Sequence, residues 1–200
     1  MRLNSSQTQA AAHAGGPALV LAGAGSGKTR VIIERMAWLI GEQGLDPRHL
    51  LALTFTNKAA NEMRTRLAAR LGADRVGVWV GTFHSFALFL LRREFDRMNR
   101  SRSFTVYDDA DQLSLMKLTI AEAGKAAQAK SPREALVWIS RRKQDLGVVT
   151  PELRQSDPVL CELWERYQAA LEHNNAVDFD DLLVFAARLL VDHHEVRAKY

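Results

Sequence analysis

The chain has 200 residues, of which 47% are apolar and 25% charged, so it can bury a core as one large domain or two small ones and is not an intrinsically disordered chain. Lys and Arg number 27 against 23 Asp and Glu, and this excess favours an anionic partner without identifying it. A single cysteine excludes an internal disulfide, and no apolar run approaches the ~20 residues of a membrane span. The start "MRLNSSQTQ" is too polar for a secretory signal. We expect a cytoplasmic protein, associated with the nucleoid if the source is bacterial.

The first part of the chain alternates short β-rich runs with helical patterns. The runs lie at residues 18–22, 50–55 and 76–82, and apolar positions at helical spacing follow each of them. This alternation predicts βαβ units and a parallel sheet. We expect the α/β region to cover residues 1–98.

Helix start signals replace the strands in the second part. They are Asp108, Ser131-Pro132, Thr150-Pro151, Asp157-Pro158 and Asp178. Glu134, three residues after Ser131, predicts a capping box there. Residues 99–200 are therefore predicted to be all-helical.

A loop of small residues follows the first β-rich run. Residues 22–29 read "AGAGSGKT", with Ala22 where the strict phosphate-binding motif has a glycine. The small residues Gly23, Ala24, Gly25, Ser26 and Gly27 let backbone N–H groups approach a phosphate at a helix N-terminus. Lys28 would then contact the β- and γ-phosphates, and the Thr29 hydroxyl would be a ligand of Mg²⁺. The alternative, a glycine-rich turn with a surface lysine, is disfavoured by the order of strand, loop and helix.

Four segments together resemble the superfamily 1 DNA helicases of the UvrD, Rep and PcrA type. They are "LNSSQ" (3–7), "AGAGSGKTR" (22–30), "LTFTNKAANEMRTR" (53–66) and "VGTFHSFALFLLRR" (80–93), and "VDFDDLL" (177–183) also looks like the family. The resemblance spans essentially the whole chain, more weakly after residue 98. It implies a P-loop, RecA-like ATP-binding domain, 1A, that is incomplete here and is interrupted by a helical subdomain, 1B, over residues 99–200.

The resemblance also implies an activity. It implies an ATP-dependent motor that moves 3′ to 5′ along single-stranded DNA and unwinds duplex in repair or replication. Its cofactors would be ATP and Mg²⁺, and its partners would be single strands and their junctions with duplex. The two alternatives are another P-loop enzyme, such as a small kinase, and a non-catalytic single-strand-binding module.

Three more residues are assigned to the nucleotide by the resemblance. Gln7 matches the family's adenine-reading glutamine, whose amide offers a donor and an acceptor to the base edge. Arg30 and Arg66 match arginines that approach the nucleotide. Without the other motifs, all three would be interpreted as ordinary surface residues.

Two further motifs are predicted to contact DNA. Phe55, Thr56 and Asn57 follow one predicted strand, and Thr82, Phe83 and His84 follow the next. Ligands of open α/β sheets bind at the carboxyl ends of the strands. Aromatic rings there can stack on any base, and the polar side chains can bind the sugar-phosphate backbone of the DNA. The alternative is that both phenylalanines are core residues and that His84 is structural.

Other features have simpler interpretations. "VDFDD" imitates an acidic metal-binding motif but lacks a buried strand before it, so we expect Asp178 to be a helix N-cap. Cys161 and the four tryptophans are expected to pack in the core. The family's catalytic Asp-Glu pair and its arginine fingers are expected beyond residue 200. The chain is therefore interpreted as the N-terminal part of a helicase, inactive by itself.

Overall fold

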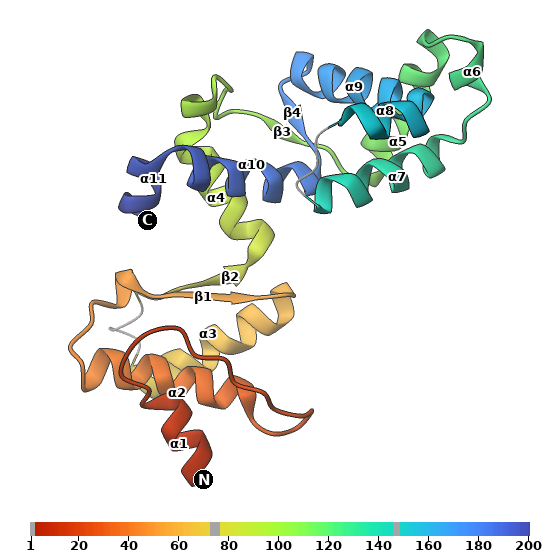
Figure 1. Ribbon diagram of the computed structural model, residues 1–200. Coiled ribbons are helices and arrows are strands. Elements are labelled where there is room, and N and C mark those ends of the chain that lie inside the picture. Colours follow the sequence, from red (N-terminus) through yellow and green to blue (C-terminus); the bar gives the residue numbers. More distant parts are fainter. Residues whose placement is uncertain (1–2, 73–76, 146–148) are drawn as a thin grey trace. The chain divides into compact units, whose positions relative to one another are not determined.

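The computed structural model describes residues 3–72, 77–145 and 149–200, which form two compact units (Figure 1). The first unit is Met1–Phe83 and the second is His84–Tyr200. The division precedes residue 98 because buried side chains of helix α4 (Phe83–Glu94) share an apolar cluster with helix α10 (Phe179–Asp192). The assignment of residues 1–98 and 99–200 to separate functional domains stays a prediction.

The first unit contains a βαβ motif. Strand β1 (Leu51–Thr54) leads through helix α3 (Asn57–Leu71) to strand β2 (Trp79–Thr82), and the two strands pair in parallel. Thr54 lies opposite Thr82 in this register, so the strands end at the same level. The predicted runs at 50–55 and 76–82 are confirmed as shorter strands, although residue 76 lies outside the described residues.

The remaining elements of this unit precede the strands. They are α1 (Ser5–Ala11), α2 (Lys28–Gly41) and the 3-10 helix η1 (Pro47–His49). One apolar stripe each from α2 and α3 packs with the strands, as expected for amphipathic helices that cover a sheet. The buried cluster consists of Ile33, Met36, Ile40, Ala52, Ala60, Met63, Leu67, Val78 and Val80.

The predicted strand at residues 18–22 was wrong. The segment has no strand structure, and Leu19 and Leu21 are 85% and 86% exposed. A strand exists only when its backbone groups pair with a neighbour. Among the described residues, β1 and β2 pair with each other and no segment pairs with residues 18–22.

The second unit is mostly helical. Its helices are α4, the 3-10 helix η3 (Phe95–Met98), α5 (Asp109–Glu122), α6 (Lys125–Gln128), α7 (Pro132–Gln144), α8 (Pro151–Ser156), α9 (Pro158–His173), α10 and α11 (His194–Lys199). Helices α5, α7, α8, α9 and α10 begin at the predicted start signals, and the Asp108, Thr150 and Asp178 side chains accept first-turn N–H bonds. Ser131 caps α7 only through its backbone, so the capping box predicted with Glu134 was wrong.

The prediction that this region is all-helical was also wrong in one place. Strand β3 (Thr105–Val106) pairs in parallel with β4 (Ala176–Val177). Two residues are too few to show the alternating pattern by which a strand is recognised. The pairing joins the chain before α5 to the chain before α10, and Val177 is fully buried.

Two apolar clusters form the core of this unit. One lies mainly among α5, α7 and α9, and the other mainly between α4 and α10. The Trp138 and Trp164 rings meet edge to face with centroids 6.0 Å apart in the first cluster. Cys161 is fully buried, as predicted.

Candidate nucleotide and DNA sites

The loop at residues 23–27 turns directly into helix α2. Gly25 and Gly27 have φ values of 73° and 83°, a left-handed conformation that L side chains rarely adopt. The Ser26 hydroxyl donates to the Gly23 carbonyl oxygen at 2.7 Å, which closes the turn. Among the described residues, no side chain caps the N-terminus of α2. Its first-turn N–H groups can therefore serve an anion.

Lys28 and Thr29 are the first two residues of α2. The Lys28 ammonium donates to the carbonyl oxygens of Ala22 at 2.9 Å and Gly23 at 2.6 Å, so it lies folded over the loop. Thr29 is partly buried one residue further on. A cation, small residues and a helix N-terminus thus converge on one turn, and this donor set fits a phosphate with its magnesium ion.

Gln7 lies next to this loop although 19 residues separate it from Ser26. Its amide nitrogen donates to the Ser26 carbonyl oxygen at 3.0 Å. Its amide oxygen accepts the Asn4 N–H at 3.0 Å, in the capping box that begins α1. The fold therefore brings the predicted adenine-reading amide to the predicted phosphate loop.

The two predicted nucleotide arginines line one shallow pocket. Arg30 on α2 and Arg66 on α3 share a pocket of about 390 Å³ with Glu34 and Arg70. Arg66 pairs with Glu62, and Arg70 pairs with Glu34 at 3.1 Å. Glu34 and Arg70 were not predicted as site residues, since each alone is an ordinary charged helix position.

Phe55 and Phe83 lie side by side. Because Thr54 and Thr82 are paired, the residues that follow them leave the sheet at the same edge. The two rings have centroids 5.8 Å apart at an angle of 42°. Phe55 is 91% exposed and Phe83 is 45% exposed, so the core alternative is excluded for Phe55.

The polar residues of these motifs have different local roles. The Thr56 hydroxyl accepts the Ala59 N–H at 3.1 Å and caps α3, and the exposed Asn57 is the first residue of that helix. Thr82 ends β2. His84, in the second unit, contacts Phe179 with ring centroids 6.0 Å apart.

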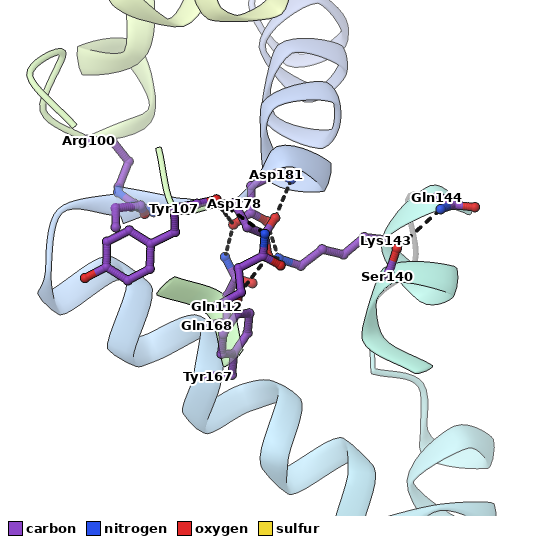
Figure 2. Close-up of polar contacts among 11 residues, drawn as sticks. Arg100, Tyr107, Gln112, Ser140, Lys143, Gln144, Tyr167, Gln168, Asp178 and Asp181 are labelled. Atoms are coloured by element: carbon purple, nitrogen blue, oxygen red, sulfur yellow. Dashed lines mark hydrogen bonds and ion pairs between the residues drawn. The ribbon is translucent and has the colours of Figure 1, made fainter. Parts of the chain in front are cut away.

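The acidic motif at residues 177–181 forms a buried ion cluster (Figure 2). Asp178 caps α10, as predicted, and its carboxylate lies 2.7 Å from the Lys143 ammonium. Asp181 lies 2.7 Å from the same ammonium, and Lys143 is only 3% exposed. The Tyr167 hydroxyl donates to Asp178 at 3.2 Å, and the Gln168 amide donates to Asp181 at 3.1 Å. We call these five residues the Lys143 cluster.

Burial dominates the electrostatics of the Lys143 cluster. Burial raises the pKa of Asp181, opposed by the adjacent Lys143 ammonium, and it also raises the pKa of the Tyr167 hydroxyl. The two carboxylates are engaged by lysine and do not form a cation site. Over the described ranges, no group of three or more His, Cys, Asp or Glu residues could hold a metal ion. No helix in the described part of the chain could span a membrane.

Sequence comparisons find related proteins over nearly the whole chain. The family description that matches residues 3–200 is the UvrD/REP helicase N-terminal domain. A Bacillus subtilis (strain 168) protein named ATP-dependent DNA helicase PcrA is 40% identical over 193 residues, which cover 94% of this chain and 26% of that protein. Proteins of the same name from Leuconostoc citreum and Staphylococcus aureus (strain Mu50 / ATCC 700699) are 38% and 36% identical, each over 99% of this chain and over 27% and 28% of their own lengths.

The match extends over nearly all of this chain but over only about a quarter of each of these relatives. It covers both units, including the loop before α2, the strand-end phenylalanines and the Lys143 cluster. The chain therefore belongs to the UvrD/REP helicase family, in the part described as its N-terminal domain.

Proposed function

We propose that the protein containing this chain is an ATP-driven motor that translocates 3′ to 5′ on single-stranded DNA and separates duplex. The observation that carries the proposal is that one unit holds both a phosphate-type loop and a pair of exposed strand-end rings. The relatives named PcrA are called ATP-dependent DNA helicases, which supports the same activity for this protein. A role in repair or replication in the cytoplasm is part of the proposal.

Each nucleotide residue has a proposed role. ATP with Mg²⁺ would supply the hydrolysable phosphate bond. Lys28 would exchange its two carbonyl contacts for phosphate oxygens, and Thr29 would be a ligand of the ion. Gln7 would read adenine, while Arg30 and Arg66 would approach the phosphates from their shared pocket. The carboxylates of Asp178 and Asp181 already form ion pairs with the Lys143 ammonium. We therefore assign the catalytic carboxylates to sequence outside residues 1–200.

DNA would be held at the carboxyl edge of the sheet. Phe55 and Phe83 would stack on bases, and Thr56, Asn57, Thr82 and His84 would contact the strand through polar groups. Stacking tolerates any base, which suits movement along a strand. Duplex separation costs ~1.4 kcal/mol per base-pair step, so repeated unwinding needs coupling to hydrolysis. We also propose that residues 1–98 belong to a RecA-like domain 1A and residues 99–200 to a subdomain 1B.

The test is ATP hydrolysis by the full-length protein with and without oligo(dT). Lys28→Ala should abolish the DNA-stimulated turnover but leave strand binding largely intact, because the ammonium serves the phosphates and the strand is held elsewhere. Lys125→Ala is the matched control, since Lys125 is an exposed lysine in the second unit. Near-normal turnover in the Lys28 variant would rule out the phosphate role.

A further inference from the structure

A side chain of α2 contacts the end of α1. The Arg35 guanidinium donates through Nη1 to the carbonyl oxygens of Ala11 at 3.3 Å and His13 at 2.8 Å. Ala11 is the last residue of α1, and the final carbonyl groups of a helix have no partner within that helix. The helix dipole also favours a cation at this end. The last turn of α1 contains only Thr, Gln and Ala, so Arg35 supplies the cation from the neighbouring helix.

Helix α1 depends on such contacts because it has only seven residues. Helices of this length are not stable in water by themselves. At its start, the Asn4 side chain accepts the Gln7 N–H at 2.9 Å and caps the helix from its own sequence. At its end, Ala11 is 5% exposed and Arg35 binds the carbonyl groups. Helix α1 therefore packs against α2 and is fixed there by Arg35 (Figure 1).

The same attachment sets the distance between Gln7 and the phosphate loop. The loop continues into α2, with Gly27 as the N-cap of that helix. The Gln7 amide nitrogen donates to the Ser26 carbonyl oxygen at 3.0 Å, and a Cβ atom on Gly27 would lie only 3.3 Å from this nitrogen. A shift of α1 along α2 would therefore either break the bond to Ser26 or press Gln7 against the loop. Arg35 thus joins the helix that carries Gln7 to the helix that carries the loop.

We propose that Arg35 is a positioning residue, which holds the Gln7 amide where it can read adenine and so maintains a preference for ATP over GTP. The inference rests on the proposed function, because it requires that Gln7 contacts the base. Adenine offers an amino donor and a ring-nitrogen acceptor to an amide, whereas guanine offers two acceptors on the same edge. Hydrogen bonds weaken steeply as their geometry departs from linear. A displaced Gln7 should therefore reduce the affinity for ATP and change the affinity for GTP little.

The experiment measures the Kd values of ATP and GTP for the full-length protein, by displacement of a fluorescent ADP analogue. Arg35→Ala should weaken ATP binding about 5-fold, the effect of losing one net hydrogen bond, and should change GTP binding little. Gln7→Ala should have the same effect. In a double-mutant cycle, Arg35→Ala should then add nothing in the Gln7→Ala background, because Arg35 acts through Gln7.

Two further variants complete the design. Arg35→Lys keeps one of the donor groups, so it should show a smaller loss of ATP affinity, again absent in the Gln7→Ala background. It carries the test if Arg35→Ala does not fold. Arg197→Ala is the matched control, since the Arg197 guanidinium also donates to a backbone carbonyl oxygen but lies in the second unit. It should bind both nucleotides as the wild type does.

The outcomes separate this inference from the proposed function. A loss of ATP affinity that disappears in the Gln7→Ala background would support the inference. Unchanged ATP affinity in Arg35→Ala, equal weakening of ATP and GTP, or a loss that adds to that of Gln7→Ala would overturn it while the proposed function stands. In the last two cases Arg35 would only stabilise the fold. If Gln7→Ala leaves the preference for ATP intact, the adenine role in the proposed function fails and the inference fails with it.

Discussion

Phe55 is almost fully exposed, although a phenylalanine directly after a buried strand is usually a core residue. The strand register explains why Phe83 lies next to Phe55, because Thr54 pairs with Thr82 and each phenylalanine follows its strand directly. An exposed pair of rings leaves apolar surface in contact with water, and such surface marks a candidate binding site. At this scale the two rings are the strongest structural argument for contact with bases.

Replacement of both rings should therefore act on binding rather than on folding. Phe55→Ala combined with Phe83→Ala in the full-length protein should weaken oligo(dT) binding by ~1–3 kcal/mol for each stacked base, with little change in the salt slope. The measurement is a binding titration at several salt concentrations. Leu118→Ala with Val191→Ala is the control, since it removes two other exposed apolar side chains. A sharp fall in melting temperature with unchanged affinity would show that the rings are structural.

The sequence singles out candidate site residues where their signal is local, and their roles stay predictions. The loop before α2 and the polar residues after β1 and β2 are contiguous motifs, and the structure brings Gln7 to that loop as the resemblance implies. Lys143 was missed because it stands in "SRRKQ", which resembles a solvated helix end. Its partner Asp178 is 35 residues away, and only the packing of α7 against α10 shows that the lysine is buried.

Helices were predictable from sequence because their start signals are local. Asp108, Thr150 and Asp178 each cap the helix that they precede. Strands depend on a partner elsewhere in the chain. The β3–β4 pair was therefore missed, and residues 18–22 were predicted as a strand although no described segment pairs with them. An apolar run shows that a segment can be buried, not that its neighbour is present.

Helix α4 is joined to α11 by a carboxylate that titrates. Glu94 is buried and accepts hydrogen bonds from the Lys199 ammonium at 2.6 Å and the Tyr200 hydroxyl at 2.8 Å, with Arg97 also nearby. The Lys199 hydrogen bond holds the pKa of Glu94 below its ordinary value of 4.5. The ionised carboxylate therefore stabilises the fold fully above the unfolded pKa, and this contribution is lost as the pH falls through the lower, folded value.

Glu94→Gln should remove the contribution of Glu94 to the pH dependence of the free energy of unfolding. The neutral amide should lower the free energy of unfolding by at most about 1 kcal/mol at neutral pH, because Lys199 is largely exposed. The variant and the wild-type chain should then converge in melting temperature as the solution is acidified. Thermal melts followed by circular dichroism across this pH range measure the difference. The control is Glu122→Gln, at an exposed position on α5. If the difference in melting temperature between Glu94→Gln and the wild type stayed the same at acidic pH, ionisation of Glu94 would not contribute to the stability of the fold.

At the scale of the whole molecule, the relatives extend well beyond the region that this chain matches. Leu19 and Leu21 are exposed in the segment that leads to the phosphate loop, whereas parallel sheets normally have both faces and their interior strands buried. The relatives named PcrA are about four times longer than the matched region. Under the proposed function, the hydrolytic carboxylates would come from sequence outside residues 1–200.

The most direct test is strand separation by the full-length protein on a duplex with a 3′ single-stranded tail. The account predicts separation that requires ATP and Mg²⁺ and that is lost in Lys28→Ala while the tail is still bound, because unwinding costs ~1.4 kcal/mol per base-pair step and must be driven by hydrolysis. Equal separation without ATP, or by the Lys28 variant, would contradict the claim that this loop powers a DNA motor.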